Sequence, residues 1–254
     1  MFLVVAIDPN TLERRSANVQ RRIADLEAAH ARDGHRLATV SHELRRPLTS
    51  ILGFALLSLD HWDELSDEEI HQAFEVIARQ ADGLNRLVAT LQTMSLSEAG
   101  YLKPVPFVID VGSALVEAVR GMPPGNDGIV IEKHPPTTVR VDPDHFQQIV
   151  SNLLANALVY GDRPISIRVV CADDWVDVSV CDLGQGVPDD FLPDLFTAFR
   201  QAEQRGQHVG TGLGLSICRA LAEANDGDLR YEHNDPRGAC FIVRLPRPRS
   251  VPGP

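Results

Sequence analysis

The sequence is short of basic residues and has no long apolar run. Its 24 lysines and arginines face 35 acidic residues, a formal net charge of −11, which argues against a surface made for nucleic-acid phosphates. The longest purely apolar opening, FLVVAI at 2–7, is too short to cross a bilayer and has no basic region before it. We therefore expect a cytoplasmic chain with no membrane span, no secretion signal and no nucleic-acid partner.

Cysteine is also scarce. The four cysteines are Cys171, Cys181, Cys218 and Cys240, and they form no C-x-x-C pair. All four fall within predicted core elements, so we expect buried, reduced thiols, as is usual in a cytosolic protein. What the chain does have is 254 residues with 44% hydrophobic residues. That is enough to bury a core, and the length suits two modest domains better than one.

Residues 1–35 form a segment of their own, with a short apolar stretch followed by a polar, helix-forming run. Leu12, Val19, Ile23 and Leu26 give that run a sparse apolar stripe, typical of an exposed helix or a coiled-coil lead-in. The stretch FLVVAIDPNTLERR loosely resembles the end of a PAS sensor domain, where a last strand runs into a signalling helix. The alternative is a strand that joins the sheet of a later domain or frays.

Residues 36–99 carry the pattern of a helical hairpin. One helix is predicted from the apolar residues Leu37, Leu44, Leu48, Ile51 and Ala55. A second is predicted after the N-cap candidate Ser66, with a heptad seam at Ile70, Phe74, Ile77, Ala81, Leu84, Val88 and Leu91. Two helices cannot bury both stripes, so we infer a homodimer whose hairpins form a four-helix bundle. The alternative is a monomeric hairpin packed on the rest of the chain.

Residues 104–247 have a different texture, because Pro104 and Pro106 end the helical pattern and shorter runs follow. Strands are predicted within 106–111, 128–134, 137–142, 165–171, 177–182, 228–233 and 239–245. Helices are predicted at about 111–121, 143–160 and 213–225. The order favours an α/β sandwich with a mixed sheet covered by helices on one face, so the whole chain is predicted to be α+β. Residues 248–254 are expected to be disordered.

Three segments of this second domain carry polar or glycine patterns. Asn152, Asn156 and Tyr160 lie four residues apart beside an apolar stripe, where asparagines often satisfy buried backbone groups. Asp182 ends a predicted strand just before Gly184 and Gly186, so it could hold a ligand amine or form an ordinary turn. Gly210, Gly212 and Gly214 open an amphipathic helix, where exposed N–H groups suit a phosphate or a simple cap.

Five motifs in order resemble the sensor histidine kinases of two-component systems. SHELRRPLTSI is similar to the phosphoacceptor box, NLLANALVY to the asparagine box and DLGQGV to the adenine-binding glycine box. LFTAFRQ and GTGLGLSI are similar to the phenylalanine box and the second glycine box. The resemblance covers residues 36–246 and rests on the ordered combination rather than on any single motif.

The resemblance implies that His42 is the phosphorylated residue. Glu43 beside it would orient the imidazole and help to take its proton. Because the apolar stripe faces the bundle core, we expect His42 to lie open to an incoming γ-phosphate. Pro47 has no N–H to donate to the carbonyl of Glu43, so the helix is expected to bend beside the histidine.

The resemblance also implies an ATP and Mg²⁺ site in the second domain. Asn156 would be the magnesium ligand, because a hard cation prefers oxygen, with Asn152 in support. Tyr160 would pack near the nucleotide, and Asp182 would bind the adenine amino group. The remaining nucleotide-binding residues would be Gly184, Gly186, Arg200, Gly210, Thr211, Gly212, Leu213 and Gly214. The polar segment 200–209 would be a mobile lid over ATP.

Two positions depart from the family pattern. Relatives commonly have a basic residue where this chain has Val159, and Arg163, Arg200 or Arg205 could supply the missing phosphate contact. Many relatives carry Thr or Asn at the position of Arg46, where a short polar side chain is thought to position the water that hydrolyses the aspartyl phosphate of the regulator. With Arg46, the chain is expected to be a poor phosphatase.

The resemblance therefore predicts an ATP-dependent protein-histidine kinase that autophosphorylates His42 and passes the phosphoryl group to an aspartate of a separate response regulator. One alternative is an ATPase of the chaperone and mismatch-repair class, which shares the nucleotide fold but lacks the SHELRRPL segment. The other is a degenerate kinase retained as a dimeric scaffold.

Overall fold

The computed structural model describes residues 40–122, 127–202 and 212–248. It consists of two compact units, Met1–Ile77 and Ala78–Pro254, each described by itself below. The predictions for residues 1–35, Gly210, Thr211, most of the lid segment and residues 249–254 lie outside the described residues. Within the described part, no helix has the length and the apolar character that a membrane span requires.

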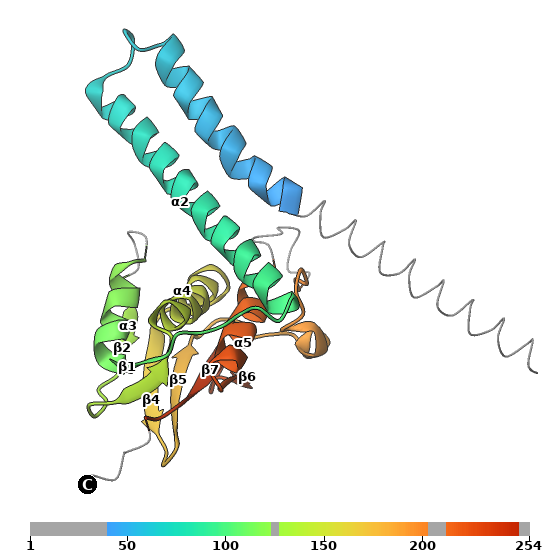
Figure 1. The fold of residues 1–254 in the computed structure, drawn as a ribbon. Helices are drawn as coiled ribbons and strands as arrows, with labels where there is room; N and C mark the ends of the chain where they lie inside the picture. The colour runs from blue at the N-terminus through green and yellow to red at the C-terminus, as the bar shows by residue number, and fades with distance from the viewer. Residues whose placement is uncertain (1–39, 123–126, 203–211, 249–254) are drawn as a thin grey trace, which may run out of the picture. The chain divides into compact units, whose positions relative to one another are not determined.

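The predicted helical hairpin is present (Figure 1) and runs from the first unit into the second. Its first helix covers residues 40–60 of the described chain and continues through Pro47. The second helix, α2, spans Asp67–Glu98 and continues into the second unit. Ser66 caps α2 as predicted: the backbone N–H of Ser66 donates to Glu69 Oε2 at 2.9 Å, and the N–H of Glu69 approaches Ser66 Oγ at 3.4 Å. This reciprocal pair is a capping box.

Much of the apolar surface of the first unit is uncovered within a single chain. Leu48 and Phe74 are 56% and 53% exposed, although they belong to the predicted apolar stripes, and the neighbouring Leu52 is 57% exposed. Side chains of this kind normally lie inside a helix bundle. The hairpin thus presents an apolar face that intrachain packing does not bury.

The second unit contains every strand and helix predicted for residues 104–247. In chain order the elements are β1 (Phe107–Asp110), α3 (Val111–Arg120), β2 (Ile129–Ile131), β3 (Thr138–Val141), α4 (Pro143–Tyr160), β4 (Ile165–Cys171), β5 (Trp175–Cys181), the 3-10 turn η1 (Leu192–Asp194), α5 (Gly214–Ala224), β6 (Asp228–His233) and β7 (Ala239–Pro246). Predicted and observed bounds differ at the ends by only a few residues.

The sheet is mixed, as predicted. Its strand order is β2-β4-β5-β7-β6, and β1 and β3 form a separate two-stranded ladder. The β2–β4 pair is parallel, and the other pairs are antiparallel. Helices α3, α4 and α5 cover one face of the sheet (Figure 1). Alternate strand residues face these helices and form the core, for example Val178 on β5 and Val243 on β7, both without exposed surface.

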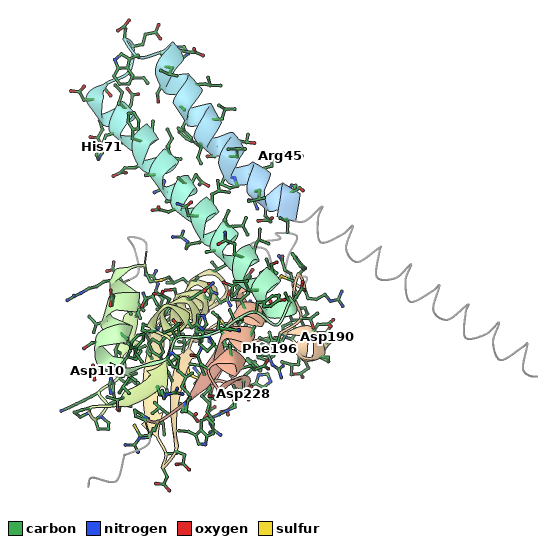
Figure 2. The ribbon with its side chains drawn as sticks, in the orientation of Figure 1. Arg45, His71, Asp110, Asp190, Phe196 and Asp228 are labelled. Atoms are coloured by element: carbon green, nitrogen blue, oxygen red, sulfur yellow. A yellow bond between two sulfur atoms is a disulfide. The ribbon has the colours of Figure 1, made fainter. Side chains whose placement is uncertain are left out.

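Aspartate residues cap the N-termini of α3 and α4. Asp110, labelled in Figure 2, accepts a hydrogen bond from the N–H of Ser113 at 2.8 Å and starts α3. Asp142 accepts from the N–H groups of Asp144 and His145 and starts α4. The buried side chain of Asn225, after α5, accepts a bond from the N–H of Asp142 at 2.9 Å. The start of α4 is therefore fixed to the end of α5.

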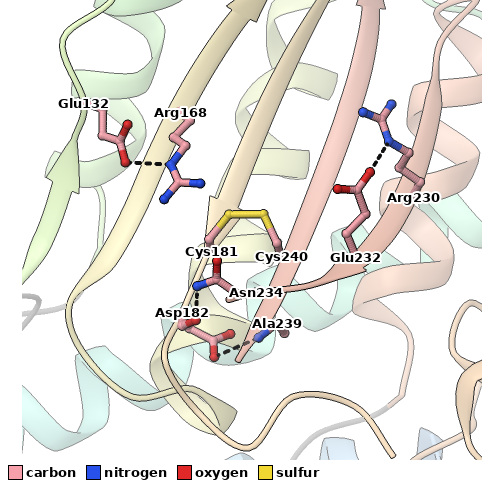
Figure 3. Close-up of a disulfide and its surroundings, with 9 residues drawn as sticks. All are labelled: Glu132, Arg168, Cys181, Asp182, Arg230, Glu232, Asn234, Ala239 and Cys240. Carbon is pink, nitrogen blue, oxygen red and sulfur yellow. Dashed lines mark hydrogen bonds and ion pairs between the residues drawn. A yellow bond between two sulfur atoms is a disulfide. The ribbon is translucent and has the colours of Figure 1, made fainter. Parts of the chain in front are cut away.

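The prediction of four buried, reduced thiols was wrong for three of the cysteines. Cys181 and Cys240 are buried but joined by a disulfide (Figure 3), because the register of β5 with β7 sets them directly opposite each other. Cys171 lies at the end of β4 and is exposed, so only Cys218 is a buried free thiol. Sequence spacing could not show the pairing, since the partners are 59 residues apart.

Candidate functional site

His42 is open to solvent, as the sequence predicted. Its side chain is 70% exposed, whereas that of Glu43 is 18% exposed, and His42 Nδ1 lies 3.7 Å from Glu43 Oε1. The carboxylate therefore faces one ring nitrogen and leaves the other to solvent. His42, Arg45, Arg46 and Thr49 line a shallow hollow on this helix, and Figure 2 shows Arg45 on the described part of the helix. Two guanidinium groups beside the imidazole suit an anionic partner.

Asp182 follows β5 and is only 4% exposed. Its Oδ1 accepts hydrogen bonds from the N–H of Gly184 at 2.8 Å and from the N–H of Ala239 at 3.3 Å. Figure 3 shows the bond from Ala239. Burial raises the pKa of the carboxyl group, the two N–H donors lower it, and the nearby charge of Asp162 raises it, with a net rise. Within the described residues both bonds end on Oδ1, so Oδ2 keeps its capacity to accept from a ligand.

Glycines allow backbone to approach this carboxylate closely. A Cβ atom added to Gly161 would lie 2.5 Å from both Cβ and Cγ of Asp182. A Cβ atom added to Gly184 would lie 2.8 Å from the Cα atom of Gly161. The residue after α4 and the turn after β5 are therefore in contact, which brings the predicted asparagine and glycine boxes together. Sequence reasoning missed Gly161, although its place directly after Tyr160 was the available signal.

The predicted polar stripe of α4 faces the start of α5. Both oxygen and nitrogen of the Asn156 side chain lie 3.9 Å from the Cβ position of Gly214, the first residue of α5. Asn152 Nδ2 is buried and bonds to no described oxygen or nitrogen atom, although the Asn152 side chain interacts with the buried thiol of Cys218. Tyr160, one turn beyond Asn156, is 51% exposed. A buried amide whose neighbour is a thiol, a weak acceptor, is unusual.

The two ends of the predicted lid also meet. The N–H of Phe199 donates to the carbonyl of Gly212 at 3.0 Å, and Gly212 has a positive φ of 69°. A Cβ atom there would lie 2.7 Å from the carbonyl oxygen of Arg200. The Arg200 guanidinium forms an ion pair with Asp194, so a phosphate contact by Arg200 would require it to exchange partners. Leu213 is fully buried under the start of α5.

Phe196 of the phenylalanine box lies beside α5. The guanidinium of Arg219 sits 5.4 Å from the centroid of the Phe196 ring, a distance typical of a cation–π contact. Phe196 is labelled in Figure 2, near Asp190 in the segment that follows the glycine box. This contact fixes the segment before the lid to the helix after it.

The residues present fit a nucleotide with its metal. Asp182 Oδ2 can accept a bond from a ring amine, and the glycines leave room for a flat ring against backbone. The first turn of a helix leaves N–H groups without intrahelical partners, so the start of α5 suits a phosphate. Among the described residues, no cluster of three or more His, Cys, Asp or Glu side chains could hold a metal ion. Asn156 offers the amide oxygen that Mg²⁺ accepts, and phosphate oxygens would have to supply further ligands.

Comparisons with known proteins agree with this arrangement. Residues 34–100 match the family model of the His Kinase A (phospho-acceptor) domain, and 141–249 match that of the histidine kinase-, DNA gyrase B-, and HSP90-like ATPase. The chain is 34% identical to histidine protein kinase DivJ of Caulobacter vibrioides, over 96% of this chain and 42% of that protein.

Solved structures give the same result. Acinetobacter baumannii histidine kinase AdeS has a TM-score of 0.62 and 25% identity, over 81% of this chain and 98% of that one. Full-length ShkA in complex with AMPPNP has a TM-score of 0.59 and 25% identity, over 86% of this chain and 47% of that one. The chain spans about half the length of the first curated relatives that it matches. The phosphoacceptor hairpin, the ATPase-type domain and these relatives together make the chain a member of the sensor histidine kinases of two-component systems.

Proposed function

We propose that this chain is the kinase core of a sensor that autophosphorylates His42 from Mg-ATP and then phosphorylates a response regulator. The observation that carries the proposal is an exposed histidine paired with a carboxylate on the phosphoacceptor hairpin, in the same chain as the Asp182 site. We propose residues 36–99 as the phosphotransfer and dimerisation domain and 104–247 as the ATP-binding domain.

In the proposed reaction, Nε2 of His42 attacks the γ-phosphorus of ATP. The N–P bond forms while the bond from the γ-phosphorus to the bridging oxygen breaks, and ADP leaves with that electron pair. Glu43 faces Nδ1 at 3.7 Å, so it favours the tautomer with a proton on Nδ1 and a lone pair on Nε2. The phosphorylated ring then releases its Nδ1 proton toward Glu43, and distances of this kind shorten in the reacting complex.

The nucleotide would be held by residues of the second unit. Asp182 would accept a bond from the adenine amino group, with Gly184 and Gly186 against the ring and Tyr160 beside it. Asn156 would bind Mg²⁺, which when bound neutralises part of the phosphate charge. Asn152 would support Asn156 in this contact. Gly210, Thr211, Gly212, Leu213 and Gly214 would shape the phosphate end.

We propose two protein partners. A second copy of the chain would cover the apolar face of the hairpin, on which Leu48 and Phe74 are exposed in the single chain, and complete a four-helix bundle. A receiver domain in trans would supply the aspartate that takes the phosphoryl group. In that step the N–P bond breaks, an O–P bond forms, and His42 is regenerated.

The test is incubation of the full chain with γ-labelled ATP, followed by treatment of the labelled protein with acid and with base. Phosphohistidine is lost in acid, whereas phosphoserine is not. We expect acid-labile label in the unmodified protein and none in His42→Gln, which should still bind ATP because acceptor and nucleotide site lie in different units. His61→Gln, a change at another exposed histidine of the hairpin region, is the matched control.

The rival functions give different results in the same experiment. ATP hydrolysis without any phosphohistidine would indicate an ATPase of the related fold. Absence of both nucleotide binding and label would indicate a scaffold. Undiminished label in His42→Gln would show that His42 is not the acceptor. Asn156→Asp should block the use of Mg-ATP, and normal labelling of that variant would remove Asn156 from the proposed metal site.

A further inference from the structure

Strand β6 contacts the glycine turn after β5 through a tyrosine hydroxyl. The N–H of Val187 donates to Tyr231 Oη at 3.2 Å. The same oxygen lies 3.5 Å from the Cβ position of Gly186, the second glycine of the turn, which has a positive φ of 74°. The hydroxyl of Tyr231 therefore holds the far end of the segment that begins at Asp182.

The near end of this segment is held from the β6–β7 turn. Asn234 Nδ2 donates to the backbone carbonyl of Asp182 at 2.7 Å (Figure 3). Gly238 lets the β6–β7 turn approach the backbone of Asp182, since a Cβ atom at Gly238 would lie 2.0 Å from the backbone carbonyl oxygen of Asp182. The N–H of Asn234 donates to the carbonyl of Gly238 at 3.1 Å and closes the turn.

The Tyr231 side chain is itself fixed. Its ring packs against Phe241, with centroids 5.5 Å apart, and against His233 at 5.2 Å. Its hydroxyl also shares a 3.0 Å hydrogen bond with His233 Nδ1, and His233 Nε2 lies 3.6 Å from Asp189 Oδ1. A rigid ring with a fixed hydroxyl can define where the N–H of Val187 lies, whereas an aliphatic residue at this position could pack but could not accept that bond.

We propose that Tyr231 and Asn234 are positioning residues for the nucleotide site: they hold both ends of the segment 182–187, so that Asp182 and its two glycines are set for adenine before it binds. This inference rests on the proposed function of that segment. Neither residue touches the nucleotide in this proposal. Their role is to reduce the ordering that binding would otherwise require, which improves affinity.

The experiment uses two substitutions in the full chain. Tyr231→Phe keeps the ring and removes only the hydroxyl, and Asn234→Ala removes the amide donor. The matched controls are Tyr101→Phe, a change at an exposed tyrosine, and Asn85→Ala on the exposed side of α2. Four quantities are measured: the rate of amide hydrogen exchange at Val187 and Gly184, the Kd for ADP, the apparent KM for ATP and the maximal labelling rate.

We expect Tyr231→Phe to speed exchange at Val187, because its acceptor is lost. The Kd for ADP and the KM for ATP should rise about three- to tenfold, as suits one hydrogen bond, while the maximal labelling rate stays within about twofold. Asn234→Ala should also raise the Kd for ADP and the KM for ATP. It should speed hydrogen exchange more at Gly184 than at Val187. Neither control should change any of the four quantities.

Two results would overturn the inference directly, and a third, given last, would also count against it. One is unchanged ADP affinity in Tyr231→Phe and Asn234→Ala when exchange shows that the segment has loosened. The other is unchanged exchange at Val187 in Tyr231→Phe. If the unmodified chain itself failed to bind ADP, the proposed function would fail, which is a different outcome because the exchange measurement needs no nucleotide. Equal falls in affinity and maximal rate would indicate general damage and would also count against positioning.

Discussion

Arg46 Nη1 lies 3.9 Å from Glu43 Oε1, the same carboxylate oxygen that lies 3.7 Å from His42 Nδ1. The arginine is one helical turn beyond His42 and shares its side of the helix. A guanidinium is always charged and only donates hydrogen bonds. It can therefore hold a phosphoryl group and steady Glu43, but it cannot accept a proton from an attacking water as a hydroxyl or amide oxygen could.

Arg46→Thr should convert a poor phosphatase into a better one. We expect the variant to increase the rate of regulator dephosphorylation about tenfold, a barrier change of about 1.4 kcal/mol, without abolishing the labelling of His42. The measurement is the decay of purified phosphorylated regulator with and without unphosphorylated kinase plus ADP. Arg45→Thr, which changes the neighbouring exposed arginine, is the control. Rapid decay driven by the unmodified chain would contradict the prediction.

Asp182→Asn should separate stability from nucleotide binding. The amide oxygen can still accept from Gly184 and Ala239, but an amide cannot carry the charge that strengthens a bond to adenine. We expect the Kd for ADP to rise about ten- to a hundredfold, in line with the loss of a charged hydrogen bond. Isothermal titration of the folded variant measures this, and normal affinity would remove Asp182 from the proposed site.

The pH dependence of stability gives a second test of Asp182. Its pKa is raised in the folded chain, so its contribution to stability is fully present below the ordinary aspartate pKa of about 3.9 and is lost as pH rises through the folded pKa. Asp182→Asn lacks this loss. Thermal unfolding should therefore show the variant gaining on the unmodified chain as pH rises from acid to neutral. A fall in the stability of Asp182→Asn relative to the unmodified chain as pH rises would contradict the prediction.

Gly161→Ala should damage both the fold and the site. The φ of Gly161 is −94°, which alanine adopts without strain, so the cost comes from the added Cβ atom 2.5 Å from Asp182. Overpacking of this kind costs about 1–3 kcal/mol, and moving Asp182 should weaken ADP binding. Gly83→Ala on α2, whose nearest contact would be Arg86 at 4.0 Å, should keep ADP affinity and should not lower stability, because alanine favours a helix interior. Equal behaviour of the two variants in denaturant unfolding would contradict this reading.

The sequence predicted the elements well because their signals are local. The alternation of apolar residues in ISIRVVC and the cap at Ser66 depend on neighbours in the chain, and both agree with the structure. Contacts between distant segments were missed. Nothing near Tyr231 indicates that its hydroxyl meets Val187, 44 residues away.

The dependence on contacts between distant segments also explains why the cysteine prediction was wrong and why residues around Asp182 were missed. The pairing of Cys181 with Cys240 depends on the register of β5 with β7, which a single sequence does not define. The motif predicted Asp182 and its glycines, but their supports, Asn234 and Gly161, come from other elements. Motif residues such as Asp182 are recognisable in the sequence by their type and order. The residues that position them are not, because their role depends on contacts between distant elements.

The two free cysteines should differ sharply in reactivity. Burial raises the pKa of the Cys218 thiol to about 12, and the side chain has no exposed surface, so at pH 8 it offers neither a thiolate nor access. Cys171 is exposed at the end of β4, with its Sγ 3.2 Å from Thr137 Oγ1. Iodoacetamide should therefore modify Cys171 in the folded chain and reach Cys218 only in denaturant. Peptide mass spectrometry reads both sites, and Cys171→Ser should remove the native adduct. Modification of Cys218 as fast as Cys171 in the folded chain would show that the interface of α4 and α5 opens readily.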